Sequence, residues 1–108
     1  MSGIYLNCVG KNIDIADNVI IDPGKGSNDN EWRCAIKLAD DLENVRILNN
    51  AFYTQLPKAI RYGIYDGANN LDNCVYMNNR IAGTGASGVP VYFAGPTRKG
   101  ANWKTNNK

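Results

Sequence analysis

Hydrophobic and polar residues alternate along several short runs of this chain. Ile13 and Ile15 are separated by one polar residue, and Val45 and Ile47 repeat the pattern further on. A period of two places alternate side chains on opposite faces, which is typical of a strand with one buried face. The alternating runs are short and leave little sequence for helices. The pattern therefore predicts an all-β chain.

The strand-like runs recur within a repeated unit of about thirty residues. Segments with asparagine at both ends begin at Asn12, Asn44 and Asn73, and a shortened fourth begins at Asn102, at spacings of 32, 29 and 29 residues. An apolar run precedes each segment, at residues 4–6, 36–38, 64–66 and 91–93. A third run follows at residues 19–21, 51–53 and 80–82. Each unit thus predicts a strand, a corner, a strand, a tight Asn turn and a third strand.

Stacking would give such units the core that one unit cannot form alone. Strands about 4.8 Å apart pair in parallel ladders over a continuous core. The pairs at residues 17–18, 49–50 and 78–79 suit sharp bends, because Asn tolerates the left-handed backbone region. Their amides would then hydrogen-bond along the stack. We predict one parallel β-helix domain over residues 1–108, with three short strands in each of about four coils. A small β-sandwich with Asn-rich turns is the alternative fold.

The coils are expected to start near residues 4, 36, 64 and 91, with the last one incomplete. The pattern from Ile36 to Asn50 reads apolar-x-apolar, spacer, Asn-apolar-x-apolar-x-Asn-Asn. It resembles the right-handed parallel β-helix, or pectate-lyase-like, superfamily, and the resemblance covers nearly the whole chain. It implies a right-handed solenoid whose carbohydrate-binding groove follows the first strand of each coil.

Bacteriophage tail spikes and fibres are the members of this superfamily that the chain resembles most. Such proteins are commonly trimers that bind, and often cut, the surface polysaccharide of the bacterial host. The resemblance therefore implies a homotrimer, or additional coils, and a location in the virion. It also leaves two other functions open, because one scaffold hosts many chemistries. These are a fragment of a polysaccharide lyase, hydrolase or epimerase, and a purely structural solenoid.

The outward positions of the first strands predict a ligand-binding column of Tyr5, Lys37, Tyr65 and Tyr92. Aromatic rings stack on the C–H faces of sugars, while phenol and ammonium groups hydrogen-bond to sugar hydroxyls. This column predicts a polysaccharide or oligosaccharide partner. The alternative is that tyrosine is simply a good strand residue that pairs with its neighbours. Trp32, in the longest loop, is either a further ligand platform or a lid over the core.

Carboxylates are candidate catalytic groups, because glycoside hydrolysis normally needs two of them across the scissile bond. Asp40 and Asp41 follow the first strand of the second unit, and Asp66 lies within the corresponding run of the third. Alternation would turn Asp66 inward, where it would need a partner. We favour a one-residue shift of that strand instead. Whether the chain is an enzyme stays open.

Charge and composition narrow the choice of partners. The chain has 108 residues, with 12 basic and 10 acidic residues spread along its length. It has no basic stripe of the kind that binds nucleic acid. Residues 1–6 do not read as a signal peptide, and no apolar run approaches the roughly 18 residues of a membrane span. We therefore expect neither nucleic acid nor membrane as a partner.

Metal and redox chemistry are not expected either. The chain lacks histidine, the commonest metal ligand, and shows no dense aspartate cluster. We expect no metal and no cofactor. Cys8, Cys34 and Cys74 have spacings that fit neither a disulfide framework nor a metal knuckle, so they are predicted to be free, mostly buried thiols. Asp14 and Arg46 occupy equivalent positions in adjacent units and are expected to form an exposed ion pair.

Overall fold

The part of the chain that the structure describes is all-β, and its strands pair in parallel. A computed structural model describes residues 2–7, 9–23, 32–55, 60–68, 70–83, 88–94 and 104–108, although not the side chains of residues 70–72 and 104. Within these residues there is no α-helix, and every strand pairing is parallel. A β-sandwich would require antiparallel pairs, which these strands do not form.

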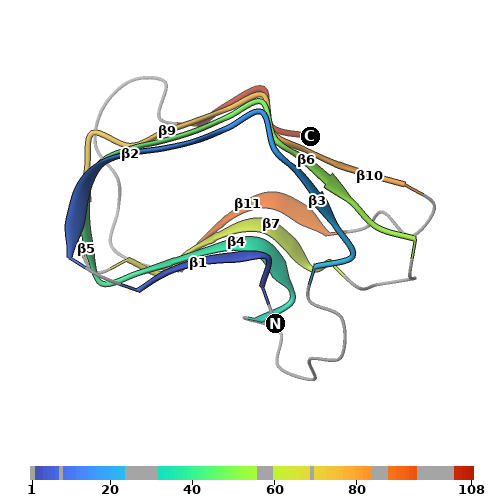
Figure 1. Ribbon diagram of the computed structural model, residues 1–108, viewed down its shortest axis with the longest axis horizontal. Helices are drawn as coiled ribbons and strands as arrows, with labels where there is room; N and C mark the ends of the chain where they lie inside the picture. Colours follow the sequence, from blue (N-terminus) through green and yellow to red (C-terminus); the bar gives the residue numbers. More distant parts are fainter. Residues whose placement is uncertain are drawn as a thin grey trace.

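Three sheets surround one interior (Figure 1). The β1 sheet contains, in order, β1 (Ile4–Asn7), β4 (Cys34–Ala39), β7 (Tyr62–Asp66) and β11 (Val89–Phe93). The β2 sheet contains β2 (Gly10–Ala16), β5 (Asp41–Leu48), β9 (Val75–Met77) and β12 (Lys104–Thr105), and β8 (Asn70–Asp72) also pairs with β5. The β3 sheet contains β3 (Val19–Ile21), β6 (Ala51–Tyr53) and β10 (Arg80–Ala82).

The repeat in the sequence is also a repeat in space. Ile4, Ile36, Ile64 and Val91 lie in register across the β1 sheet. Leu38 is paired with Asp66, so β7 keeps the register of the other strands. The proposed one-residue shift of this strand is therefore wrong, and Asp66 does turn inward.

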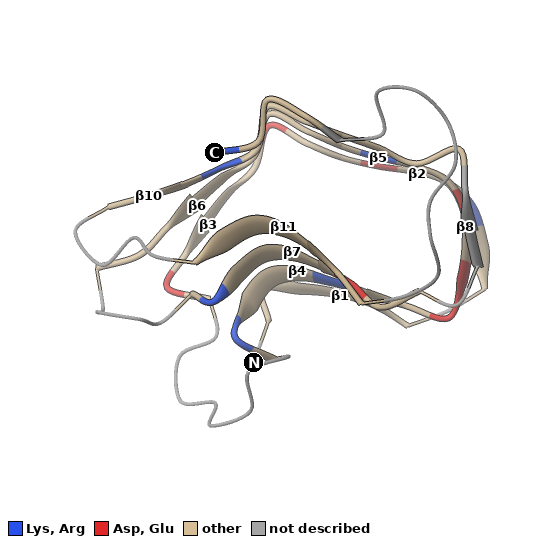
Figure 2. Cartoon of the chain, turned by 180° about the vertical axis from the view of Figure 1, so that it is seen from behind, with Lys and Arg blue, Asp and Glu red and all other residues tan. Residues whose placement is uncertain are grey.

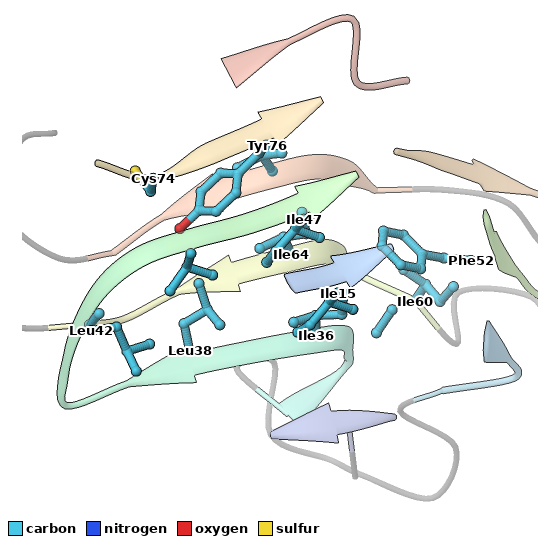
Figure 3. Packing of buried hydrophobic residues seen from close by; sticks show 14 residues of the cluster. Ile15, Ile36, Leu38, Leu42, Ile47, Phe52, Ile60, Ile64, Cys74 and Tyr76 are labelled. Carbon is cyan, nitrogen blue, oxygen red and sulfur yellow. The ribbon is translucent and has the colours of Figure 1, made fainter. Parts of the chain in front are cut away.

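The core is filled from all three sheets (Figure 3). Ile36 and Leu38 come from β4, Val45 and Ile47 from β5, and Phe52 from β6, and each of these side chains is fully buried. Strand pairing within one sheet would leave its apolar face in water. Burying each large aliphatic or aromatic side chain stabilises the fold by roughly 1.5–3 kcal/mol. The shared interior therefore couples the three sheets to one another.

The tight turns and their asparagine ladder agree with the sequence prediction. Asp17, Asn49, Asn78 and Asn106 adopt left-handed φ angles of 58°, 57°, 58° and 51°. The asparagine after each of them joins a ladder: Asn18 Nδ2 donates to Asn50 Oδ1 (3.1 Å), Asn50 Nδ2 to Asn79 Oδ1 (2.9 Å), and Asn79 Nδ2 to Asn107 Oδ1 (3.0 Å). The ladder satisfies amides that the bends would otherwise leave unpaired.

A second set of bends divides the β2 sheet, where the sequence indicated simple strand starts. Asn12, Asn44 and Asn73 have φ angles of 58°, 54° and 53°. The bend at Asn73 separates β8 from β9, which pair with the two halves of β5. Asn44 Nδ2 also donates to Asn12 Oδ1 (3.0 Å), so these bends have their own side-chain hydrogen bond.

A column of small residues lets the β1 sheet approach the β3 sheet. Gly3, Ala35 and Gly63 precede the registered isoleucines of β1, β4 and β7. A Cβ on Gly63 would lie 2.9 Å from Phe52 Cδ2 and 2.5 Å from the carbonyl oxygen of Pro90. Glycine is therefore needed at position 63 for the Phe52 ring to fit.

Cys34 and Cys74 are buried, as predicted, whereas Cys8 lies outside the described residues. In the described part of the chain, no helix has the length and apolar character needed to cross a membrane.

Candidate functional site: an aromatic face on the β1 sheet

The β1 sheet brings the predicted ligand-binding column together on its outer face. Tyr5 is paired with Lys37, Lys37 with Tyr65, and Tyr65 with Tyr92. Their neighbours in the same strands, among them Ile36 and Ile64, fill the core, so these four side chains point away from it. The placement of the column therefore follows the sequence prediction.

Tyr62 is a further member of this face that the sequence prediction missed. Its ring stacks on that of Tyr92, with centroids 4.3 Å apart and an interplanar angle of 24°, and lies 5.6 Å from the Tyr65 ring. Strict alternation would turn Tyr62 inward together with Ile64. Because both Gly63 and Ile64 face the interior, the alternation is interrupted and Tyr62 falls on the outer side. Gly63, directly after Tyr62, is the feature of the sequence that could have indicated this interruption.

Lys37 is enclosed by rings instead of projecting into solvent. Its Nζ lies 3.6 Å from the ring centroid of Trp32, 5.3 Å from that of Tyr65 and 5.7 Å from that of Tyr5. Only 6% of Lys37 is exposed. Cation–π attraction to several ring faces offsets part of the cost of removing the ammonium from water. The Lys37 ammonium is therefore held among rings, and its contact with a ligand stays a prediction.

Trp32 covers Lys37, so it lies on the outer face and not over the apolar core. Its ring also meets Tyr5 edge to face, with centroids 5.0 Å apart at 81°. Tyr5 and Tyr92, at opposite ends of the column, expose 42% and 39% of their surface. Both end residues therefore keep accessible surface, although Tyr92 also stacks on Tyr62 and Tyr5 meets Trp32. We call Tyr5, Trp32, Lys37, Tyr62, Tyr65 and Tyr92 the aromatic face.

A guanidinium borders the aromatic face. Arg61 Nε donates a hydrogen bond to Tyr62 Oη (3.2 Å), and its Cζ lies 5.7 Å from the Tyr62 ring centroid. Figure 2 shows basic residues on β4 and at the start of β7, in keeping with Lys37 and Arg61. Exposed rings, phenol hydroxyls and an exposed guanidinium can together contact the apolar and the polar parts of a sugar.

The candidate catalytic carboxyl groups do not share an accessible space. Asp66 has no exposed surface: Tyr76 Oη donates to its Oδ2 (2.9 Å) and the backbone N–H of Ala68 to its Oδ1 (3.2 Å). Asp40 makes a left-handed corner, and its Oδ1 accepts from the N–H of Asp41, the first residue of β5. Asp66 therefore faces the core while Asp41 is exposed, and no step of glycoside hydrolysis is assigned to them.

A depression of about 340 Å³, lined mostly by polar residues, lies on the β2 sheet. Its lining residues are Asn12, Asp14, Asn44, Arg46, Asn73 and Val75. The predicted ion pair lies within it: Arg46 Nε and Nη2 donate to Asp14 Oδ1 (2.8 Å) and Oδ2 (2.7 Å). These hydrogen bonds lower the pKa of the Asp14 carboxyl and raise the pKa of Arg46 relative to their ordinary values. The two charges are already paired with each other, so the depression presents little net charge to a ligand.

Among the described residues, no three His, Cys, Asp or Glu side chains are grouped so that they could hold a metal ion. Comparison of the chain with protein-family models, with curated proteins and with solved structures found no match.

Proposed function

We propose that this chain is a segment of a right-handed parallel β-helix, similar to those of phage tail spikes and fibres, that binds bacterial surface polysaccharide. In this proposal residues 1–108 form one domain, and the partner is a polysaccharide or oligosaccharide. The protein would act in the virion as a homotrimer or with additional coils. The registered parallel strands and the repeating asparagine turns support the solenoid arrangement.

The aromatic face is the observation that carries the ligand proposal. Five rings gather on one outer sheet face, and the exposed ones, Tyr5 and Tyr92, are separated by two strands. Neighbouring strands are about 4.8 Å apart, so the two rings stand roughly 14 Å apart along the stack. That span suits an extended glycan of about three sugars better than a single sugar. A glycan would stack on the two exposed rings and hydrogen-bond to the phenols and to Arg61.

A purely architectural role is the second candidate, and one observation favours it. Tyr62, Tyr65 and Tyr92 already pack on one another, and Lys37 is already enclosed by Trp32. Such contacts stabilise a sheet without any ligand. Glycan binding requires Tyr5 and Tyr92 to contact the ligand. An architectural role requires only that they help to stabilise the sheet.

A glycan array probed with the labelled chain tests the proposal. Bacterial capsular and lipopolysaccharide oligosaccharides are the glycans of interest. Tyr92→Ala and Tyr5→Ala should each weaken a saturable signal by tenfold or more. Tyr53→Ala is the matched control, because Tyr53 is 36% exposed but lies on β6 of another sheet, and it should bind like the parent chain. Absence of any saturable signal, or equal binding by all variants, would favour the architectural role.

A further inference from the structure

Lys37 places its ammonium on the face of an indole ring. It lies on β4 between β1 and β7, so its register neighbours on the two sides are Tyr5 and Tyr65. Its Nζ is closest to Trp32, at 3.6 Å from the ring centroid, and is 5.3 Å and 5.7 Å from the centroids of Tyr65 and Tyr5. A cation is attracted to the face of an aromatic ring, where the π electrons lie. One face of Trp32 is therefore occupied by Lys37.

The direction of the Trp32 ring depends on side-chain contacts. Trp32 lies just before β4 and outside its ladder. The backbone beside it is anchored, because the carbonyl oxygen of Arg33 accepts from the N–H of Arg61 (2.7 Å). This bond fixes where the Trp32 side chain begins, but not where its ring points. The ring itself contacts Lys37 through its face and meets Tyr5 edge to face, and these contacts set its direction.

The charge of Lys37 matters more for this ring than for the stability of the sheet. Only 6% of the residue is exposed, so its ammonium has given up most of its contact with bulk water. That loss is costly, and attraction to the rings offsets part of the cost. A methionine of similar length would fill the same space without a charge to desolvate. The ammonium therefore contributes a fixed ring direction, which an apolar side chain would not.

We propose that Lys37 is a positioning residue of the aromatic face. It binds the inner face of Trp32 and so keeps the outer face of that ring turned toward a sugar, as a further stacking platform. Trp32 is half-buried, so part of it stays accessible while Lys37 is in place. A glycan then meets a ring that is already ordered, and binding does not include the cost of ordering it. This inference rests on the glycan function proposed above.

Two substitutions of Lys37 separate positioning from packing. Lys37→Met keeps a stem of similar length but removes the cation, whereas Lys37→Arg keeps a cation that also binds ring faces. Lys11→Met is the matched control, because Lys11 is exposed on β2 of another sheet. Affinity is measured with the capsular or lipopolysaccharide oligosaccharide that gives the strongest saturable signal on the array. Urea denaturation of each variant measures the free energy of unfolding.

Lys37→Met should weaken oligosaccharide binding roughly tenfold, as expected for loss of a desolvated cation–π contact, while its unfolding free energy stays equal to that of the parent chain or rises. Lys37→Arg should bind within about threefold of the parent chain, and Lys11→Met should match the parent chain. Unchanged affinity in Lys37→Met, an equal loss in Lys37→Arg, or a fall in the unfolding free energy of Lys37→Met would overturn the inference.

A spectroscopic measurement tests the contact without any glycan. Protons that lie over the face of an aromatic ring resonate upfield, so the ε-methylene signals of Lys37 should lie upfield of those of the other lysines. They should return to the ordinary lysine position in Trp32→Leu. Ordinary Lys37 signals in the parent chain would overturn the inference even if a glycan binds.

Failure of the inference and failure of the proposed function give different results. If the parent chain binds no oligosaccharide, the glycan function is refuted, and the role of Lys37 in binding is refuted with it. If the parent chain binds an oligosaccharide and Lys37→Met binds it equally well, only the inference about Lys37 is refuted.

Discussion

The Tyr76 hydroxyl donates a 2.9 Å hydrogen bond to Oδ2 of Asp66 inside the apolar core, where both side chains have no exposed surface. Figure 3 shows Tyr76 among the aliphatic side chains that fill this core. Burial of a carboxyl group is costly unless its oxygens are hydrogen-bonded. The bond therefore links β9 of the β2 sheet to β7 of the β1 sheet across the interior.

Removing that hydroxyl should destabilise the fold. Tyr76→Phe removes the hydroxyl that donates to Asp66 Oδ2 in the core, and we expect the free energy of unfolding to fall by about 1–3 kcal/mol. Urea denaturation measures the change. Tyr62→Phe is the matched control, because its hydroxyl accepts a bond from Arg61 at the surface, and it should change stability by less than about 0.5 kcal/mol. Equal effects of the two variants would contradict the structural role of the Asp66 contact.

The asparagine ladder should be most sensitive to change at its buried steps. Asn50 Oδ1 accepts two bonds from Asn18, and its Nδ2 donates to the carbonyl oxygen of Ile15 and to Asn79 Oδ1. Asn50→Ala should therefore lower the unfolding free energy by about 2–3 kcal/mol, because it leaves buried polar groups unpaired. Asn18→Ala, at the exposed end, should cost about 1 kcal/mol or less. A larger loss at Asn18 than at Asn50 in chemical denaturation would be inconsistent with this ladder.

The small-residue column makes a prediction about packing. Gly63→Ala places a methyl group against Phe52 and the Pro90 backbone, so we expect a loss of about 1–3 kcal/mol from overpacking. Ala35→Gly, at the equivalent position of the neighbouring strand, removes a methyl group and should cost about 0.5–1 kcal/mol. Thermal unfolding of the two variants provides the comparison. A neutral Gly63→Ala variant would mean that Phe52 does not pack against β7.

The Asp14–Arg46 pair predicts a pH dependence. Arg46 lowers the folded-state pKa of Asp14, so the pair stabilises the fold above the unfolded pKa of about 3.9, and this contribution is lost as pH falls through the lower folded pKa. An NMR titration of the Asp14 carboxyl should show a pKa below that value. Arg46→Gln should move the Asp14 pKa back toward its ordinary value. An unchanged Asp14 pKa in Arg46→Gln would refute the assignment.

The strand positions and the turns could be predicted because they rest on local and repeated chemistry. Alternating apolar residues identified the three strand runs, and paired asparagines identified the left-handed turns with their stacked amides. Each feature is visible within one unit, and its recurrence in the next unit supports the same register.

The remaining features depend on contacts between sheets, which a linear pattern does not contain. Asp66 in the core accepts a hydrogen bond from Tyr76, which comes from another sheet, as well as one from the backbone N–H of Ala68. Lys37 is enclosed by Trp32 together with Tyr5 and Tyr65, and Tyr62 lies on the outer face where Gly63 packs against Phe52. Side-chain partners that come from separate strands in this way change both the exposure and the direction of a residue.

Binding of oligosaccharide to the aromatic face is the central claim, and an amide NMR titration tests it most directly. A capsular or lipopolysaccharide oligosaccharide panel is added to the isotope-labelled chain. The account predicts saturable shifts that cluster at Tyr5, Trp32, Tyr65 and Tyr92 and disappear in a Tyr5→Ala/Tyr92→Ala double variant. A spectrum that no member of the panel changes, or shifts confined to the polar depression around Arg46, would contradict it.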